Sequence, residues 1–181
     1  SLASTGYGIM LSGPEGTAGG WDMSSPSPAI KYFVPATGQG SWKGAAGANV
    51  ALKSQDAWMV FVRGDRSVTG IWDAPKPTTL RSKGTVFTGT KSVSIPAIDQ
   101  GFYLVGNPYP SAIDMRNVTG MVTSGTYYVW NPNLGGIYGL GAYQTFTYDN
   151  DKKHYVSVPS KDTLGDIINS GQAFFVQTST S

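Results

Sequence analysis

The sequence predicts an all-β protein: an antiparallel β-sandwich, jelly-roll-like, with about ten short strands and long Gly- and Pro-rich loops. The 181 residues include 24 Gly and 11 Pro, whereas charged residues make up only 13% of the chain, well below the globular norm of about 25%. Glu15 is the only Glu, so the acidic residues are almost all Asp, which favours turns over helices. Long helices are therefore not expected.

Ten short runs with period-two alternation or many β-branched residues are the expected strands. In chain order they cover residues 7–12, 29–35, 48–54, 57–63, 85–95, 101–106, 126–131, 141–148, 154–158 and 172–177. Alternation is clearest in 85–95 and 143–148, where one face can be apolar and the other solvated. The runs 58–62 and 173–176 are apolar on both faces and are expected in central strands.

The remaining stretches are predicted to be loops or single helical turns. Loops are expected at 12–28, 36–47, 64–84 and 132–141, where Gly, Pro, Ser and Asn are frequent. Short helical turns are expected at 111–116, after Pro110, and at 161–168, with Asp162 as its cap. The length is that of one domain, so residues 1–181 are predicted to form a single β-sandwich domain in which 1–28 are loosely ordered.

Composition argues against several classes of function. A net charge of +2 with scattered Lys residues does not predict binding to nucleic acid. There is no Cys and only one His, so neither disulfides nor metal sites that need several thiolate or imidazole ligands are expected. No apolar run approaches the eighteen or so residues that span a bilayer, so membrane insertion is not predicted.

The sequence predicts no catalytic residues. His154, the single His, lies inside an alternating strand, and no Gly-x-Ser-x-Gly motif occurs. The chain is therefore predicted not to be an enzyme. A glycoside hydrolase that uses two carboxylates, for instance Asp65 and Asp99, stays open as an alternative because a linear sequence does not reveal how far apart they lie.

Aromatic residues in loops are the main functional candidates. Trp21, Trp42 and Trp72 lie in Gly- and Pro-rich loops, and Tyr138 lies in the Gly-rich stretch 135–139. Exposed Trp and Tyr rings can stack on sugar rings, so these four residues are candidate glycan-binding residues. The structural alternative is that a loop Trp folds inward to cover the edge of the core. Trp58 and Trp130 belong to apolar strand-like runs and are expected in the core.

Two short polar motifs are better explained as turns than as binding sites. Arg63-Gly64-Asp65 follows an apolar strand, so Asp65 is expected to bond the backbone two residues on and Arg63 to pair with a carboxylate, although the triplet also matches an adhesive tripeptide. Asp149-Asn150-Asp151 separates two predicted strands and has hairpin chemistry. Its oxygens are also weak candidate Ca²⁺ ligands, and Ca²⁺ is the only cofactor considered.

Four segments carry a resemblance to a known group of proteins. They are Trp58–Arg66 (WMVFVRGDR), Gly101–Asp114 (GFYLVGNPYPSAID), Tyr127–Pro132 (YYVWNP) and Ser170–Val176 (SGQAFFV). Together they resemble a β-sandwich module of large secreted and surface proteins of Bacteroidota that are exported by the type IX secretion system. This resemblance implies an extracellular location and a chain cut from a larger multidomain protein, with neighbouring domains of the same chain as partners.

The resemblance also assigns a structural corner to Asn107, Pro108, Tyr109, Pro110 and Asp114. The two prolines fix the backbone, Asn107 is expected to bond the turn, Tyr109 to fill the space behind it, and Asp114 to bond the backbone of the corner. Asp162-Thr163-Leu164 fits the short pattern on which proteins of these bacteria receive O-linked glycans, so Thr163 is a candidate acceptor.

Three functions follow from these observations. The first is a non-catalytic extracellular module for binding, adhesion or spacing in a cell-surface or secreted protein. The second is a carbohydrate-binding module attached to a secreted enzyme that degrades polysaccharides, with an extracellular glycan as its partner. The third is the carboxylate-dependent glycoside hydrolase.

Overall fold

The computed structural model describes residues 8–49, 57–70, 72–81, 84–121, 125–135, 141–160 and 165–178. Within these ranges the protein is all-β, as the sequence predicts, with twelve short strands. Its helical content there is confined to two 3-10 turns, Gly16–Gly19 (η1) and Met115–Asn117 (η2). No helix in this part of the chain is long and apolar enough to cross a membrane.

The chain forms two compact units, each with a hydrophobic core of its own. The first unit comprises Ser1–Tyr32, Trp42–Leu52 and Trp58–Thr85, and the second comprises Phe33–Ser41, Lys53–Ala57 and Val86–Ser181. That residues 1–181 make one sandwich domain stays a prediction.

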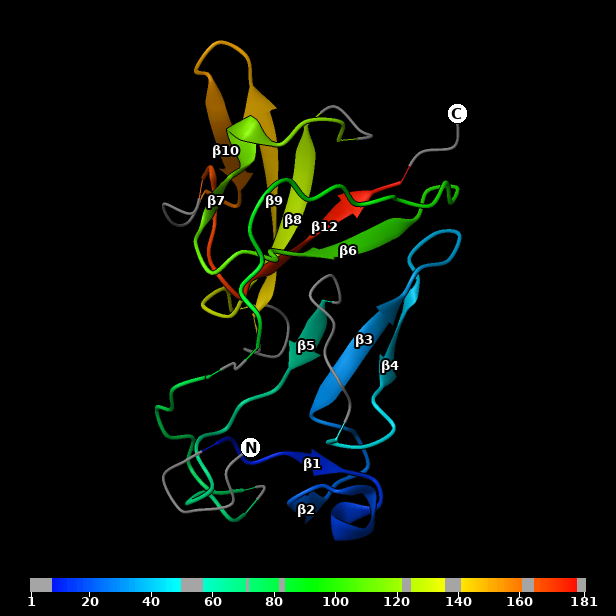
Figure 1. Ribbon diagram of the computed structural model, residues 1–181, viewed down its shortest axis with the longest axis vertical. Helices are drawn as coiled ribbons and strands as arrows, with labels where there is room; N and C mark the ends of the chain where they lie inside the picture. The colour runs from blue at the N-terminus through cyan, green and yellow to red at the C-terminus, as the bar shows by residue number, and fades with distance from the viewer. Residues whose placement is uncertain are drawn as a thin grey trace. The chain divides into compact units, whose positions relative to one another are not determined.

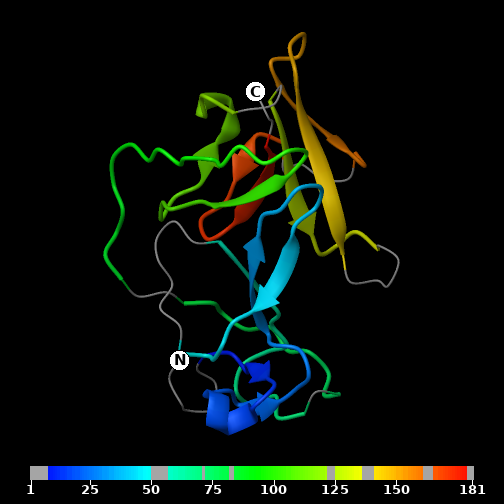
Figure 2. The ribbon, with the colours of Figure 1, turned by 90° about the vertical axis from the view of Figure 1, so that its right-hand side faces the viewer.

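The second unit contains a five-stranded antiparallel sheet in the order β10-β9-β8-β12-β6 (Figure 1). In that order the strands are His154–Val158, Ala142–Asp149, Thr126–Asn131, Ala173–Gln177 and Phe102–Gly106. Figure 2 shows the long strand β9 running beside β10. β12 has a partner on both sides, which confirms the central position expected for residues 173–176.

Alternation sorts the side chains of this sheet onto two faces. One face contributes Tyr127, Val129, Phe146, Phe174 and Val176 to the core of the unit. A second layer consists of β7 (Ile113–Asp114), η2 and β11 (Ile167–Ile168). It completes the core with Met115 of η2 and Ile168 of β11. β7 and β11 pair antiparallel, and their packing over the sheet is consistent with the predicted β-sandwich.

Strands β6 and β12, which come from the segments Gly101–Asp114 and Ser170–Val176, are hydrogen-bonded to each other. β6 and β12 pair along their whole length, from Phe102 opposite Gln177 to Gly106 opposite Ala173. The ladder continues into the corner, where the backbone N–H of Asn107 donates to the backbone carbonyl of Gln172 at 2.9 Å. The corner is thereby attached to the closing strand of the sheet.

The first unit contains two small sheets. Strands β1 (Ser12–Gly13) and β2 (Met23–Ser24) form a parallel pair. The second sheet has the order β4-β3-β5, with strands Ser41–Gly44, Ile30–Val34 and Trp58–Val60. The core of the unit consists of Leu11, Trp21, Ala29, Ile30 and Ala45.

The structure describes residues 8–28 of the stretch 1–28, whose loose order stays a prediction. Residues 8–28 form β1, η1 and β2, and the Trp21 side chain is only 2% exposed. A Cβ atom at Gly13 or at Gly19 would collide with the Trp21 indole. The glycines therefore allow the chain to wrap closely around a buried ring.

Two strand predictions and one loop prediction are wrong within the described residues. Residues 85–95 form no strand, although their alternation is the clearest in the sequence. Only Ser12 of the predicted strand 7–12 is in a strand, and the predicted loop 36–47 contains β4. Alternation indicates that one face is suited to burial, but a strand also needs a neighbouring backbone to pair with.

The other differences concern strand position and the helical turns. The run 57–63 shortens to β5, which is at the edge of its sheet and not central as expected. The helical turn at 111–116 is replaced by β7 followed by η2. Most of the predicted strand 48–54 and the first half of the predicted turn 161–168 lie outside the described residues.

Candidate functional site

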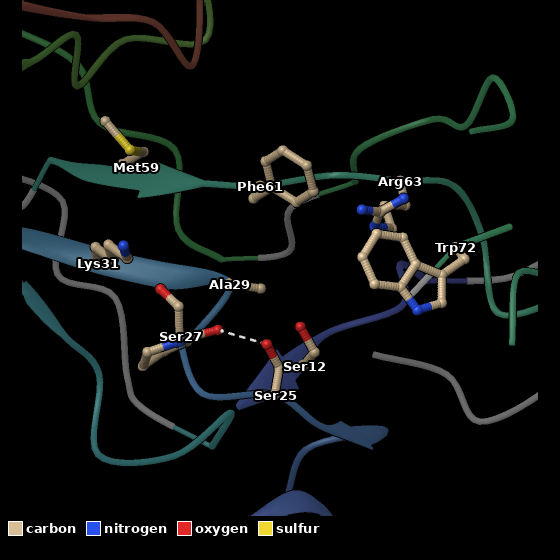
Figure 3. Close-up of a pocket in the computed structure, with 10 residues that line it drawn as sticks. Ser12, Ser25, Ser27, Ala29, Lys31, Met59, Phe61, Arg63 and Trp72 are labelled. Atoms are coloured by element: carbon tan, nitrogen blue, oxygen red, sulfur yellow. Dashed lines mark hydrogen bonds between the residues drawn. The ribbon is translucent and has the colours of Figure 1, made fainter. Parts of the chain in front are cut away.

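A groove in the first unit has a volume of about 330 Å³ and combines aromatic, hydroxyl and cationic side chains. Figure 3 shows Lys31 and Met59 towards one end, Arg63 and Trp72 towards the other, and Phe61 between them. We call it the Trp72 groove. Its lining residues are Ser12, Ser25, Ser27, Pro28, Ala29, Lys31, Met59, Phe61, Arg63 and Trp72.

Trp72 stands at the tip of a short turn that is closed by Asp73. The Asp73 carboxylate accepts hydrogen bonds from the amides of Thr69 at 3.1 Å and Gly70 at 2.7 Å, and its own amide donates to the Gly70 carbonyl at 3.2 Å. The turn leaves the Trp72 side chain 91% exposed. This exposure confirms the expectation for Trp72, and an indole in that position offers a flat apolar face to a ligand.

Arg63 is held beside this turn from two sides. Its Nη1 lies 3.5 Å from the Asp73 carbonyl oxygen, and its guanidinium carbon lies 5.4 Å from the centre of the Phe61 ring. Its own carbonyl accepts the Lys76 amide at 2.7 Å. The arginine therefore links the turn of Trp72 to the aromatic floor of the groove.

The Arg63-Gly64-Asp65 triplet serves as a turn, as the sequence predicts. Asp65 accepts the Ser67 amide at 2.8 Å, and the hydrogen bonds from Ser67 lower the pKa of the Asp65 carboxyl. Gly64 is buried, and a Cβ there would press on Val68. The expected ion pair forms at another residue, because Arg66, and not Arg63, pairs with the carboxylate of Asp22.

The other side of the groove comes from β3 and the loop before it. Lys31 is opposite Met59 in the β3–β5 pair and is half-buried, whereas its neighbour Ile30 faces the core. Ser25 and Ser27 bring hydroxyls, and the Ser25 hydroxyl donates to the Ser27 carbonyl at 3.2 Å. Of the groove residues, the sequence predicted Trp72 as a binding residue but not Lys31, Phe61 or Arg63. The one available signal was a Lys inside the apolar run of β3.

The remaining aromatic candidates do not join the groove. Trp21 is buried in the core, so its expected exposure is wrong: two glycines bring the backbone close enough to enclose it. Trp42 is half-buried in β4, and Tyr138 lies outside the described residues. Trp58 packs on the core as expected, but Trp130 is 40% exposed and not a core residue, because its position in β8 faces away from the buried side of the sheet.

Asn107 holds the corner between β6 and β7, which confirms its expected role. Its side-chain NH₂ lies within hydrogen-bond distance of three carbonyls, at 2.9 Å from Ser111, 3.2 Å from Ile168 and 3.1 Å from Asn169. Its side-chain oxygen accepts the Tyr109 amide at 2.9 Å. One amide side chain thus joins two parts of the chain about sixty residues apart.

Tyr109 and Asp114 have other partners than those expected. The Tyr109 hydroxyl donates to the Gly89 carbonyl at 2.8 Å and accepts the Lys91 amide at 3.1 Å, and its ring packs on Phe87. Asp114 caps η2 by accepting the Arg116 amide at 2.9 Å, so the expectation that it bonds the proline corner is wrong. The Arg116 guanidinium beside it lowers the pKa of the Asp114 carboxyl.

Asp149, Asn150 and Asp151 form the β9–β10 turn, as expected. Asp149 accepts the amides of Asp151 at 3.0 Å and Lys152 at 3.1 Å, and its carboxylate lies 3.1 Å from the Lys152 ammonium. These contacts lower the pKa of the Asp149 carboxyl. In the part of the chain that the structure describes, no group of three or more His, Cys, Asp or Glu side chains is placed to hold a metal ion.

The carboxylates considered for catalysis are not part of the groove. Asp65 belongs to the first unit and Asp99 to the second, and the lining of the Trp72 groove includes no Asp or Glu. His154 is half-buried in β10, with Nδ1 2.9 Å from the Tyr155 carbonyl oxygen. Thr163, the candidate glycan acceptor, lies outside the described residues.

Comparison with known families gives one match. A model for a domain of unknown function, DUF8693, matches residues 28–181, which is most of the chain. The chain belongs to the DUF8693 family. The match includes the groove residues Lys31, Phe61, Arg63 and Trp72 together with the Asn107 corner. A search of curated proteins and a search of solved structures each found no match.

Proposed function

We propose that this DUF8693 chain is a non-catalytic binding module of a secreted or cell-surface protein, and that it binds a saccharide in the Trp72 groove. The proposal joins the two non-catalytic functions that the sequence left open. The proposed extracellular location of the chain, with neighbouring domains of the same protein as partners, rests on the resemblance to exported surface proteins. The proposed binding needs neither Ca²⁺ nor another cofactor.

The single observation that carries the proposal is the exposure of two aromatic rings on one groove. Trp72 is 91% exposed and Phe61 is 54% exposed, and both line the same cavity. Exposed apolar rings are costly in water unless a partner covers them, and the face of a sugar ring is a suitable partner for an indole. The serine hydroxyls of the groove add hydrogen-bonding groups that can pair with sugar hydroxyls.

The composition of the lining supports binding over catalysis. Hydrolysis of a glycosidic bond by the common mechanisms needs two carboxyl groups on opposite sides of the bond. The groove lining has hydroxyl and cationic groups but no carboxyl group. The glycoside hydrolase thus has no candidate site here, and a spacer function alone would leave the exposure of Trp72 unexplained.

Binding to immobilised and soluble polysaccharides tests this proposal. We expect the full chain to bind at least one polysaccharide, and Trp72→Ala to weaken that binding about tenfold or more, because loss of one stacking ring is worth about 1 to 2 kcal/mol. Trp130→Ala is the matched control, since it removes another exposed ring outside the groove.

Three outcomes would contradict the proposal. Equal affinities of the wild-type chain and Trp72→Ala would place any glycan site elsewhere. Release of reducing sugars from a polysaccharide by the purified chain, lost when Asp65 or Asp99 is replaced by Asn, would make the chain an enzyme. Binding to no polysaccharide at all would favour the adhesion or spacer function.

A further inference from the structure

The Trp72 groove contains two cationic side chains and no carboxylate. Lys31 and Arg63 both line it. Among the described residues, Arg66, Arg116 and Lys152 form ion pairs with carboxylates. Asp65, two positions after Arg63, accepts the Ser67 amide, and Asp73, which directly follows Trp72, accepts the amides of Thr69 and Gly70. The positive charge of the groove is therefore not neutralised by its own lining.

We propose that the Trp72 groove selects acidic saccharides, and that Arg63 and Lys31 bind acid groups on different sugars of one chain. This inference rests on the proposed saccharide site and adds the chemical class of its ligand. The shared chemistry is an anionic group, either a uronic acid carboxylate or a sulfate ester.

The Arg63 guanidinium is already positioned to donate hydrogen bonds to such a group. Its guanidinium lies over the Phe61 ring at 5.4 Å and its Nη1 lies 3.5 Å from the Asp73 carbonyl oxygen. The backbone beside it is fixed, because Gly64 is buried and the Met10 amide donates to the Gly64 carbonyl at 3.2 Å. A guanidinium that is already oriented loses little freedom on binding, and its planar N–H groups match the two oxygens of a carboxylate or sulfate.

Lys31 provides the second charge at a distance from the first. It lies towards the opposite end of the groove from Arg63 and Trp72 (Figure 3). Its place in β3, opposite Met59, fixes where its stem leaves the backbone. Because Lys31 and Arg63 lie towards opposite ends of the groove, a chain of acidic sugars can place an anion at each end.

Neutral sugars are the less favourable ligands for the same reason. A sugar stacked on Trp72 and Phe61 would partly desolvate Lys31 and Arg63 without providing a counter-charge, and desolvation of an unpaired cation is unfavourable. An acidic sugar makes charge-assisted hydrogen bonds in the same position. The groove therefore discriminates by charge in addition to shape.

Pairs of polymers that differ only in charge test this inference. Affinity is measured for the full chain with polygalacturonate and its methyl ester, and with dextran sulfate and dextran. We expect at least one acidic polymer to bind about tenfold or more tightly than its neutral counterpart, because hydrogen bonds to charged groups are the stronger ones. Raising the salt concentration should reduce this preference.

Single substitutions assign the preference to the groove. Arg63→Gln and Lys31→Gln should each reduce the affinity for the acidic polymer about tenfold while leaving the affinity for the neutral one unchanged. Arg63→Lys should restore part of the loss. Lys43→Gln is the matched control, because Lys43 is exposed in the same unit but does not line the groove. Circular dichroism verifies that each variant is folded.

The outcomes separate this inference from the proposed function. If acidic and neutral polymers bind equally, and Trp72→Ala weakens both, the groove is a saccharide site without charge selection and the inference is wrong. If Lys43→Gln weakens acidic binding as much as Arg63→Gln does, the preference is a general charge effect and the inference is also wrong. If no polymer binds, both the inference and the proposed function fail.

Discussion

Asn107 shows how much one polar side chain can contribute to a fold of short strands. Its amide reaches the carbonyls of Ser111, Ile168 and Asn169 and accepts the amide of Tyr109. The NH₂ group donates to carbonyls at the end of β11 and in the corner, and the Asn169 carbonyl also accepts the Gln172 backbone amide at 3.1 Å. Pro108 and Pro110 restrict the backbone on either side of Tyr109, so the geometry of these contacts is set before they form.

We expect Asn107→Ala to lower the free energy of unfolding by about 2 kcal/mol, because several hydrogen bonds are lost at once. Asn107→Asp should be destabilising as well, since a carboxylate keeps the acceptor for Tyr109 but cannot donate to the three carbonyls. Urea unfolding followed by tryptophan fluorescence measures both effects. Asn133→Ala is the control, because only the backbone amide of Asn133 bonds to Asn131. If Asn107→Ala is as stable as wild type, the Asn107 hydrogen bonds do not stabilise the fold and this prediction is wrong.

Tyr127 is the most enclosed ionisable side chain of the second unit's core. It is fully buried, its ring stacks on Phe146 with the centroids 4.9 Å apart, and its hydroxyl donates to the Gly165 carbonyl. Burial, and then the nearby Tyr155 and Asp166, raise the pKa of the Tyr127 hydroxyl above its ordinary value. The folded state therefore favours the neutral phenol.

This raised pKa predicts a loss of stability in alkali. The contribution of Tyr127 is fully present below the ordinary tyrosine pKa of about 10 and decreases as the pH rises above it, because the unfolded chain then releases a proton that the folded chain retains. Urea midpoints measured from pH 8 to 11 should fall less steeply for Tyr127→Phe than for wild type. Tyr155, whose pKa burial also raises, should account for part of the remaining slope. Identical slopes for wild type and Tyr127→Phe would contradict the assignment.

At the scale of elements, the segment 84–98 shows that an alternating sequence does not always form a strand. Its apolar residues do not all find a core: Ile95 packs on the second unit's core, whereas Val86 is 62% exposed. Tyr109 anchors the middle of the segment through Phe87, Gly89 and Lys91. The segment follows the surface of the unit and is attached at a few points, without a strand ladder.

Amide hydrogen exchange tests this attachment. We expect the amides of residues 88–94 to exchange much faster than those of β8, β9 and β12, with Lys91 as the protected exception because its amide donates to the Tyr109 hydroxyl. In Tyr109→Phe the protection of Lys91 should be lost while β12 stays protected. Slow exchange along the whole segment would show that it pairs as a strand, as its alternation first indicated.

At the scale of the whole molecule, two cores share one interleaved chain. The chain passes from the first unit to the second and back twice before it enters the second unit for good at Val86. One of these crossings falls inside β3, between Tyr32 and Phe33. Because β3 continues across the boundary between the units, we expect the two units to unfold together.

We therefore expect a single calorimetric unfolding transition whose calorimetric and van't Hoff enthalpies agree. Phe146→Ala in one core and Trp21→Ala in the other should each lower the free energy of unfolding by about 3 to 5 kcal/mol. Both should therefore lower the midpoint temperature of this single transition. The milder variants Phe146→Leu and Trp21→Phe serve if the first pair does not fold. Two separate transitions, each shifted by only one substitution, would mean two independently folding domains.

Short-range chemistry made part of this structure predictable. β8, β9, β10 and β12 lie within two residues of their predicted bounds, because their alternating aromatic and β-branched side chains suit a sheet with one buried face. The turns at Asp65 and Asp149 were predictable for a similar reason, since each carboxylate bonds amides two or three residues further on. Such contacts need only neighbours along the chain.

The sequence by itself thus determined the all-β class, the main strands of the large sheet and the chemistry of its turns. Only the tertiary structure decided that Trp21 is enclosed while Trp72 is exposed, although both lie in Gly- or Pro-rich stretches. It also decided that Lys31 of β3 and Arg63, thirty-two positions later, line one groove. Burial and the composition of a site depend on which distant segments come together, and local periodicity contains no record of that pairing.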